Sequence, residues 1–377
     1  MDFTLSDDQR ELRDLAARIL GDATSDEALR DFAAGDEPYN ADLWRTLAEA
    51  GLLGLAISEQ AGGLGLGVVD LGLLLEEQGR TLAPLPLTPT IAMAATAIDR
   101  HGSAEQKDAW LPRVLAGDLL ITAAVEEVGN VDPHAPMTKA TADGNGWRLS
   151  GVKTAVPYAA QSAAILVTAQ AETGPALFLI EPDASGVSIE AQTGTNGEPQ
   201  GLLTLDDVSI SGDALIGNVE DGAKIVADLI ARGQVALSQR QVGVAAEALR
   251  RTAEYSSGRI QFGKPLGSMQ AVQQRAADAF IDVEAMRSTS LLAAWQLDRD
   301  ELKPADIASA KYWAAMGGHR VVHTAQHLHG GMGADITYPI HRFFLNATQI
   351  GETLGGANPM LSVIGAAIAD ERAETLT

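Results

Sequence analysis

The segment Arg259-Ile260-Gln261-Phe262-Gly263-Lys264-Pro265-Leu266 lies between two long stretches of helical periodicity. Apolar residues recur at helical spacing from 223 to 257 before it and from 269 to 295 after it. Proline cannot continue a helix, and glycine tolerates the backbone angles at which helices end. The segment therefore predicts a short turn between two long helices.

Two interpretations of this turn stay open. A cation at a helix C-terminus stabilises the helix dipole, so Arg259 can simply mark the end of a helix. An arginine can also bind a phosphate through two parallel hydrogen bonds, and the amide side chains of Gln261 and Gln270 are close in sequence. The second interpretation predicts a phosphate-binding segment.

Helical periodicity dominates the chain on both sides of a middle part that has a different pattern. Short apolar or alternating runs, bounded by turn residues, predict a small antiparallel sheet with strands at 119–125, 147–152, 163–169, 176–180 and 202–208. Further helices are predicted at 43–50, 69–82, 89–101, 104–115, 304–327 and 360–373. The fold class is therefore mainly α with a β domain, with domains predicted at 1–117, 118–217 and 218–377.

Composition excludes several classes of protein. The chain has 377 residues, and 27 Lys and Arg against 50 Asp and Glu give a formal charge of −23. Such a surface repels nucleic acid and anionic membranes. The absence of Cys removes disulfides, thiolate nucleophiles and Cys-ligated metals. The acidic N-terminus and the lack of an apolar run of about 18 residues predict a cytoplasmic protein without membrane insertion.

Other patterns are weaker candidates for ligand binding. His319, His323 and His327 recur every four residues on one helix face, but no carboxylate pair accompanies them, so no metal site is predicted. The run His329-Gly330-Gly331-Met332-Gly333 can end a helix or let backbone approach a ligand closely.

Acid–base chemistry would depend on carboxylates. Glu352 lies in a Gly-flanked break between helical segments, where it can also be a first-turn carboxylate at the start of a helix. Glu126 and Glu127 follow the first predicted strand, and they can equally be a solvated pair. Both alternatives stay open for each site.

Together, five motifs resemble those of the acyl-CoA dehydrogenase family, and the resemblance covers nearly the whole chain. In order they are Leu5-Ser6-Asp7-Asp8-Gln9-Arg10-Glu11-Leu12, Glu59-Gln60-Ala61-Gly62-Gly63-Leu64-Gly65, the segment 102–112, R-x-Q-F-G-x-P at 259–265 and H-G-G-M-G at 329–333. Their order and spacing carry the resemblance more than any single motif does.

The resemblance implies an N-terminal helical domain, a middle β domain and a C-terminal four-helix bundle, assembled as a tetramer. It implies FAD, an acyl-CoA substrate and electron-transferring flavoprotein as the electron acceptor. A carboxylate would remove the α-proton of the thioester while hydride leaves the β-carbon for the flavin. It also implies that the adenine half of a neighbouring subunit's FAD is held by Arg259, Gln261, Phe262, Gln270, His327, Gly330 and Gly331.

The chain departs from the family pattern around the flavin ring. The family's T-E-P-x-A-G-S-D is here Val125-Glu126-Glu127-Val128-Gly129-Asn130-Val131-Asp132, and K-x-W-I-T is Lys153-Thr154-Ala155-Val156-Pro157. An indole that would pack on the flavin is thus replaced by a methyl group, and a hydroxyl donor by a proline. His327 stands where the family usually has Gln, with Gln326 one place away.

The catalytic base departs from the pattern as well. The family's two base positions fall at Gly233 and at Leu354, or at Gly355 if one residue is inserted. Glu352 reaches the second position only if two residues are deleted. Because a base must approach the α-hydrogen to within about 3 Å, neighbouring positions are not equivalent.

Motifs for a neighbour's FAD are therefore kept, whereas those for the chain's own flavin and base are changed. This pattern predicts a subunit of an α2β2 acyl-CoA dehydrogenase for bulky, steroid-like acyl-CoA in lipid β-oxidation, sharing active sites with a paralogous partner. The alternatives are a homotetramer that uses Glu352 as its base, a flavin enzyme that reacts with O₂, and a structural subunit without FAD.

Overall fold

The computed structural model describes residues 4–375, and it divides into two compact units. The first unit comprises Met1–Asp31, Gly72–Ala83 and Gln234–Thr377, and the second comprises Phe32–Leu71 and Pro84–Gly233. Among the described residues, no helix combines the length and the apolar character needed to cross a membrane.

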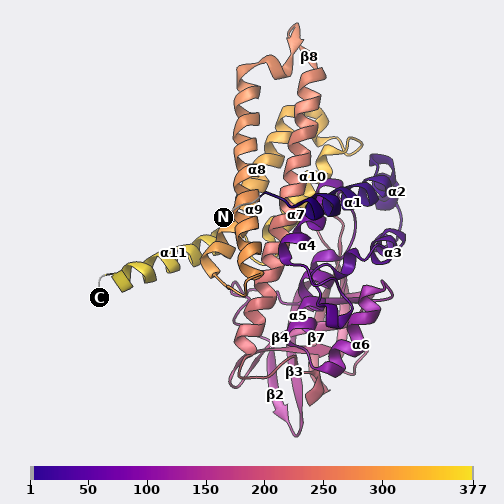
Figure 1. The fold of residues 1–377 in the computed structure, drawn as a ribbon, viewed down its shortest axis with the longest axis vertical. Coiled ribbons are helices and arrows are strands. Elements are labelled where there is room, and N and C mark those ends of the chain that lie inside the picture. The colour runs from indigo at the N-terminus through magenta and orange to yellow at the C-terminus, as the bar shows by residue number, and fades with distance from the viewer. Residues whose placement is uncertain (1–3, 376–377) are drawn as a thin grey trace. The chain divides into compact units, whose positions relative to one another are not determined.

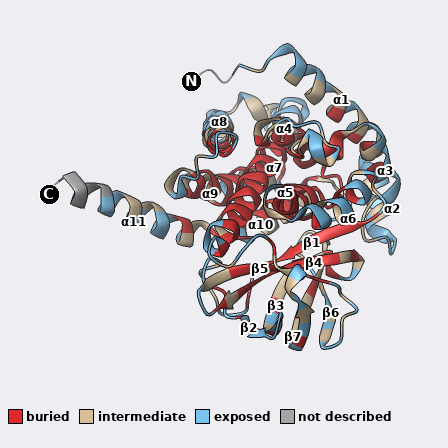
Figure 2. Ribbon diagram, turned by 60° about the horizontal axis from the view of Figure 1, so that its bottom comes forward, coloured by how far each residue is buried: buried red, intermediate tan, exposed pale blue. Residues whose placement is uncertain are grey.

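Long helices dominate the first unit. They are α7 (Gly222–Gly258, of which the part from Gln234 belongs here), α8 (Gln270–Leu297), α9 (Pro304–His329), α10 (Ile340–Glu352) and α11 (Ala357–Thr375). Figure 1 shows α7 and α8 as a helical hairpin with β8 (Ile260–Gln261) at its tip. The helices α7, α8 and α9 meet in a core of small and apolar residues: Val242, Ala245, Ala279, Val283, Met286 and Val321. Figure 2 shows α7 buried along most of its length.

Two N-terminal helices, α1 (Asp7–Ala23) and α2 (Asp26–Ala34), and the end of α4 (Val68–Thr81) complete this unit. Helix α4 crosses α7 closely because glycines face the contact. A Cβ at Gly243 would lie 1.8 Å from the Glu76 carbonyl oxygen, and one at Gly79 would lie 1.9 Å from that of Arg240. Neither position therefore accepts a side chain without moving the helices apart.

The second unit joins short helices to a sheet. Its helices are α3 (Ala41–Glu49), η1 (Leu52–Gly54), η2 (Glu59–Ala61), the π-helical η3 (Leu87–Ala95), α5 (Thr96–His101), α6 (Ala104–Leu115), η4 (Ala159–Gln161) and η5 (Gly212–Ala214). Its strands are β1 (Leu120–Ala124), β2 (Lys139–Asp143), β3 (Gly146–Pro157), β4 (Ser162–Ala171), β5 (Gly174–Ile180), β6 (Val187–Thr193) and β7 (Pro199–Ser211). The predicted strands are all present, whereas β2 and β6 were not predicted.

The strand order is β1-β4-β2-β3-β7-β6, with β5 paired to β4. Most pairs are antiparallel, but β4 runs parallel to both β1 and β2, which corrects the purely antiparallel prediction. Parallel neighbours need a crossover connection, and between β1 and β4 the β2–β3 hairpin supplies it. Strand β2 escaped prediction because only Ala140 of its residues is buried, so it shows no apolar alternation.

Candidate cofactor site

The turn between α7 and α8 is a small β-hairpin. Strand β8 (Ile260–Gln261) pairs with β9 (Lys264–Pro265), and Phe262 and Gly263 form the turn with φ of 53° and 77°. Both residues thus adopt the left-handed conformation that a two-residue hairpin turn of this type requires. Phe262 is 88% exposed and Ile260 is 55% exposed. Both apolar side chains are thus accessible to another molecule.

Three of the predicted side chains keep their hydrogen-bond donors free. Arg259 follows α7 directly, and within residues 4–375 no hydrogen bond or ion pair engages its guanidinium. Gln261 on β8 and Gln270, the first residue of α8, are both exposed. These side chains are therefore available to a ligand beside the hairpin.

The glycine loop presents open backbone. Helix α9 ends at His329, Gly330 follows with φ 59°, and η7 (Gly330–Ala334) continues the chain. Gly330 and Gly331 are exposed, and a Cβ built on either would have no atom within 4 Å. The amide of Gln326 donates to the Gly333 carbonyl at 3.2 Å and so shapes the loop, whereas His327 is exposed. A ligand can thus approach this backbone closely.

A cavity of about 680 Å³ lies beside the end of α7, lined by Asp26, Arg250, Arg251, Glu254, Tyr255, Gly258, Arg259, Tyr338, Pro339 and Ile340. Tyr255 and Tyr338 form its aromatic side, with ring centroids 6.4 Å apart. Neither tyrosine was predicted. The signal for Tyr255 was its position four residues before Arg259, which puts both on one face of the helix end.

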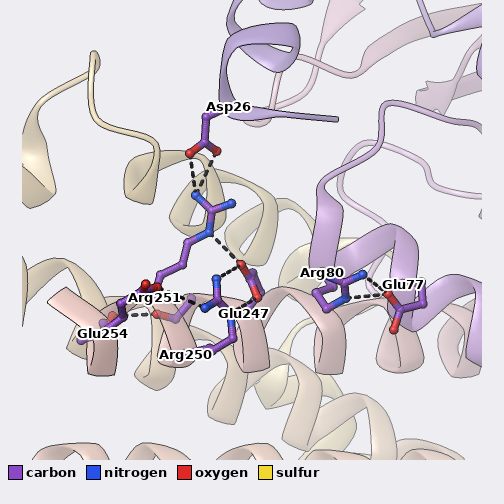
Figure 3. A network of polar contacts seen from close by, with 9 residues as sticks. Asp26, Glu77, Arg80, Glu247, Arg250, Arg251 and Glu254 are labelled. Atoms are coloured by element: carbon purple, nitrogen blue, oxygen red, sulfur yellow. Dashed lines mark hydrogen bonds and ion pairs between the residues drawn. The ribbon is translucent and has the colours of Figure 1, made fainter. Parts of the chain in front are cut away.

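Two of the three arginines in this cavity already have carboxylate partners. Arg251 contacts both oxygens of Asp26 at 2.9 Å and Glu247 at 2.8 Å, while Arg250 binds Glu247 at 2.8 Å and Glu254 at 3.2 Å, as Figure 3 shows. Burial alone raises the pKa of Glu247, but the arginine hydrogen bonds outweigh it and the pKa is lowered. Of the three cavity arginines, Arg259 is thus the one whose guanidinium no described residue engages, so it can bind an anion.

These groups fit the nucleotide half of a dinucleotide cofactor. A free guanidinium suits a pyrophosphate, because it can donate two parallel hydrogen bonds. Exposed amides and an open glycine backbone supply further contacts without steric conflict. The seven predicted cofactor residues are all exposed and lie at two segments, the hairpin with the start of α8 and the end of α9.

The predicted base lies at the end of a helix, not at the start. Glu352 is the last residue of α10 and is exposed, which corrects the alternative of a first-turn carboxylate. Helix α10 was not predicted, although its buried residues Ile340, Phe343 and Ile350 follow helical spacing. The carboxylate lies above Gly356, where an added Cβ would be 2.8 Å from it.

Neither of the family's two base positions is itself a carboxylate on this chain. Leu354 is 4% exposed, has φ 56°, and its carbonyl accepts a hydrogen bond from Gln234 at 2.9 Å. The buried ammonium of Lys311 donates to the carbonyls of Ile350 at 2.9 Å and Gly351 at 2.8 Å, which fixes the turn before it. Gly233 is buried within α7. An apolar side chain therefore occupies the C-terminal base position.

In the second unit, a buried ion pair occupies the segment that follows β1. The Lys153 ammonium lies 2.8 Å from Glu127 and 2.9 Å from the Thr168 hydroxyl, and the side chains of the ion pair are 0% and 1% exposed. Glu127 also accepts from the backbone N–H groups of Met137 at 2.6 Å and Thr138 at 2.8 Å. Glu127 is therefore neither a solvated carboxylate nor a free base, but the anchor of the loop from 128 to 137.

The electrostatics of this pair follow from its surroundings. Burial raises the pKa of Glu127, but hydrogen bonds from Lys153, Thr138 and Met137 outweigh it, and the pKa falls to about 2. Burial lowers the pKa of Lys153 to about 8, against the opposing effect of Glu127. Sequence reasoning missed the pair, although a lysine inside an alternating strand pattern was a usable signal.

A pH prediction follows from Glu127. Its pKa is depressed from 4.5 to about 2, so its contribution to stability is complete above pH 4.5 and is lost as pH falls towards 2. The loss amounts to about 3 kcal/mol. We expect Glu127→Gln to flatten the acid limb of a plot of unfolding free energy against pH, measured with urea. An acid limb of unchanged slope would contradict this assignment.

The strand expected beside the flavin is hydrogen-bonded within this chain at both altered positions, Ala155 and Pro157. Ala155 has φ 50°, and its N–H donates to the Gln192 side chain at 2.9 Å. The Thr122 hydroxyl donates to the Pro157 carbonyl at 2.6 Å. Neither an aromatic ring nor a hydroxyl donor is present at the two altered positions.

The three spaced histidines do not converge on a ligand. The rings of His319 and His323 lie 5.7 Å apart and both pack near Phe344. Within residues 4–375, no group of three or more His, Asp or Glu side chains is arranged to hold a metal ion.

Comparisons with known proteins agree with this architecture. Residues 6–118, 122–208 and 220–369 match the family models of the acyl-CoA dehydrogenase N-terminal, middle and C-terminal domains. Acyl-CoA dehydrogenase FadE27 of Mycobacterium tuberculosis is 36% identical over 379 residues, covering 98% of this chain and 99% of the relative. The chain therefore belongs to the acyl-CoA dehydrogenase family.

Two solved structures are also similar over almost the whole chain. A variant of the Tcur3481–Tcur3483 steroid ACAD has a TM-score of 0.92 and 44% identity, covering 98% of this chain and 100% of that one. The ChsE4–ChsE5 complex from Mycobacterium tuberculosis has a TM-score of 0.92 and 36% identity, covering 98% and 99%.

Proposed function

We propose that this chain is one subunit of an FAD-dependent acyl-CoA dehydrogenase that shares its active sites with a paralogous partner. The proposal rests on the contrast between two parts of this chain, the nucleotide-binding side and the position of the catalytic base. The nucleotide-binding side has an unpaired Arg259 and open glycine backbone, whereas the base position holds buried Leu354.

In this proposal the chain binds and orients the cofactor of its partner. Arg259 would hold the pyrophosphate, and the nucleotide half would be bound by Gln261, Phe262, Gln270, His327 and the backbone of Gly330 and Gly331. When bound, FAD would supply the acceptor for the hydride that leaves the acyl β-carbon. The partner supplies the carboxylate that removes the α-proton, because Leu354 cannot take up a proton.

The proposed substrate is the CoA thioester of a bulky, steroid-like acid. This proposal is supported by the likeness to two solved structures, Tcur3481–Tcur3483 and ChsE4–ChsE5, each of which is named for two different proteins. The first of these is called a steroid ACAD. Electron-transferring flavoprotein is the proposed acceptor. Substrate-reduced enzyme that is reoxidised by O₂ as fast as by that acceptor would instead favour an oxidase.

The proposal is tested by expressing the chain alone and together with its nearest paralogue from the same genome. We expect acyl-CoA dehydrogenation only from the co-purified complex, in which both chains are present in equal amounts. A homotetramer of this chain that is yellow and active on its own would refute the proposal.

Glu352 provides a separate prediction. Because it ends α10 in an exposed position, we expect Glu352→Gln to leave the turnover of the complex within about twofold, with FAD content unchanged. If Glu352 were the base, turnover would fall by several orders of magnitude while FAD stayed bound. Thr353→Ala at the next residue is the matched control. Steady-state kinetics with the same acyl-CoA distinguishes the two outcomes.

A further inference from the structure

His329 is a buried imidazole that the proposed function does not yet use. It is the last residue of α9, immediately before the open backbone of Gly330, and it is 2% exposed. Its Nδ1–H donates to the Ala325 carbonyl at 2.8 Å, because a carbonyl can only accept. This bond makes Nε2 the acceptor of a neutral ring.

Aromatic contacts fix this ring from two sides. Tyr255 of α7 stacks on it with ring centroids 4.3 Å apart and planes 23° apart, and Tyr338 lies tilted against it at 5.4 Å. Tyr255 and Tyr338 are also the aromatic residues that line the cavity beside Arg259. The imidazole thus connects that cavity to the glycine loop.

One atom of the ring is left without a partner. Nε2 is buried and makes no hydrogen bond within the described part of the chain. Protonation would place a positive charge at an atom that has no carboxylate partner among the described residues. A buried unpaired charge is among the most costly changes that a protein site can undergo.

We propose that His329 is a positioning residue that, as a neutral ring clamped between Tyr255 and Tyr338, holds the Gly330–Gly331 backbone in its cofactor-binding conformation. The identity of the ligand, FAD, rests on the proposed function, whereas the clamp itself does not. When the ring becomes protonated, it leaves its place between Tyr255 and Tyr338. The backbone that follows α9 at Gly330 is then no longer held in one conformation.

The groups that face the His329 ring support the dependence of the clamp on the protonation state of the ring. On α7 the contacting group is Tyr255, on α9 it is the Ala325 carbonyl, and before α10 it is Tyr338. The charged residues Arg251, Asp26 and Glu254 act on Tyr338 beyond the ring. Burial lowers the pKa of His329 below its ordinary 6.5, and only the bond to Ala325 opposes it.

The sign of the pH effect follows. A released ring titrates at its ordinary pKa of 6.5, whereas the clamped ring titrates lower, so protonation favours release as pH falls below 6.5. FAD binding should therefore weaken as pH falls from 7.5 to 5.5, by at most about tenfold, which is the limit set by a released ring with a pKa of 6.5. The neutral clamp is complete at pH 7.5.

The experiment measures FAD affinity of the co-purified complex at both pH values for the wild type, His329→Phe, His329→Gln and the exposed control His323→Phe. We expect FAD binding to weaken at pH 5.5, by up to about tenfold, in the wild type and in the control. We expect this pH effect to vanish in His329→Phe, which keeps an aromatic ring that cannot be protonated. His329→Gln, which does not titrate either, should bind FAD more weakly at both pH values.

A second readout does not depend on the cofactor. Hydrogen–deuterium exchange of residues 326–334 in the cofactor-free complex, corrected for the intrinsic rate, should be faster at pH 5.5 than at 7.5 in the wild type and in His323→Phe, but not in the two His329 variants. A pH effect as large as that of the wild type in both His329 variants would overturn the inference. If the wild type binds no FAD at pH 7.5, the proposed function fails, while the exchange data still decide the clamp.

Discussion

Replacing Arg259 with alanine should weaken FAD binding by the complex about 30- to 150-fold. Arg259 has no partner within the described residues, so its removal leaves no unpaired protein group behind. The loss is then that of charged hydrogen bonds to a pyrophosphate, about 2–3 kcal/mol. Few other single changes at the hairpin should have a comparable effect.

Flavin fluorescence during titration of the cofactor-free complex measures this effect. Arg259→Lys should recover part of the affinity, because lysine keeps the charge but not the planar pair of donors. Arg299→Ala is the matched control, since that arginine is 56% exposed near the opposite end of α8. Unchanged FAD content in Arg259→Ala would favour a structural subunit without FAD.

Replacing Lys153 with methionine should lower the free energy of unfolding by about 3–5 kcal/mol. The substitution leaves the Glu127 carboxylate buried without its cation, and breaking a buried ion pair from one side costs about this much. The loop from 128 to 137 should loosen first, because Glu127 receives the N–H groups of Met137 and Thr138.

Urea unfolding followed by circular dichroism tests this expectation. The double variant Lys153→Met with Glu127→Leu should recover much of the loss, since no charge then stays buried. Lys303→Met is the control, because its ion pair with Glu301 is half exposed and contributes about 0–1 kcal/mol. A loss below about 1 kcal/mol in Lys153→Met would mean that water reaches the pair.

Much of the fold was predictable because its periodicity is local. The helical patterns before and after Arg259 correspond to α7 and α8, and Pro265 and Gly263 mark the turn between them. The sheet was predicted only in part. Strand β2 is mostly exposed and lacks the apolar alternation on which strand prediction depends.

The candidate site, too, was predictable only where its residues lie close together in the sequence. Arg259, Gln261 and Phe262 belong to one continuous motif, so sequence order alone brings them together. Tyr255 and Tyr338 share a cavity although 83 residues separate them (338 − 255), and sequence spacing gives no sign of that contact. The Glu127–Lys153 pair was missed for the same reason, because it forms only after β3 and the loop following β1 are brought together.

The FAD stoichiometry of the purified assembly tests the division of labour between subunits most directly. Absorption of released flavin against amino-acid analysis of each chain gives the ratio. The proposed sharing of sites predicts one FAD for every two chains, one of them this chain, and none on this chain purified alone. One FAD per chain in an assembly built only from this polypeptide, with turnover of acyl-CoA, would contradict it.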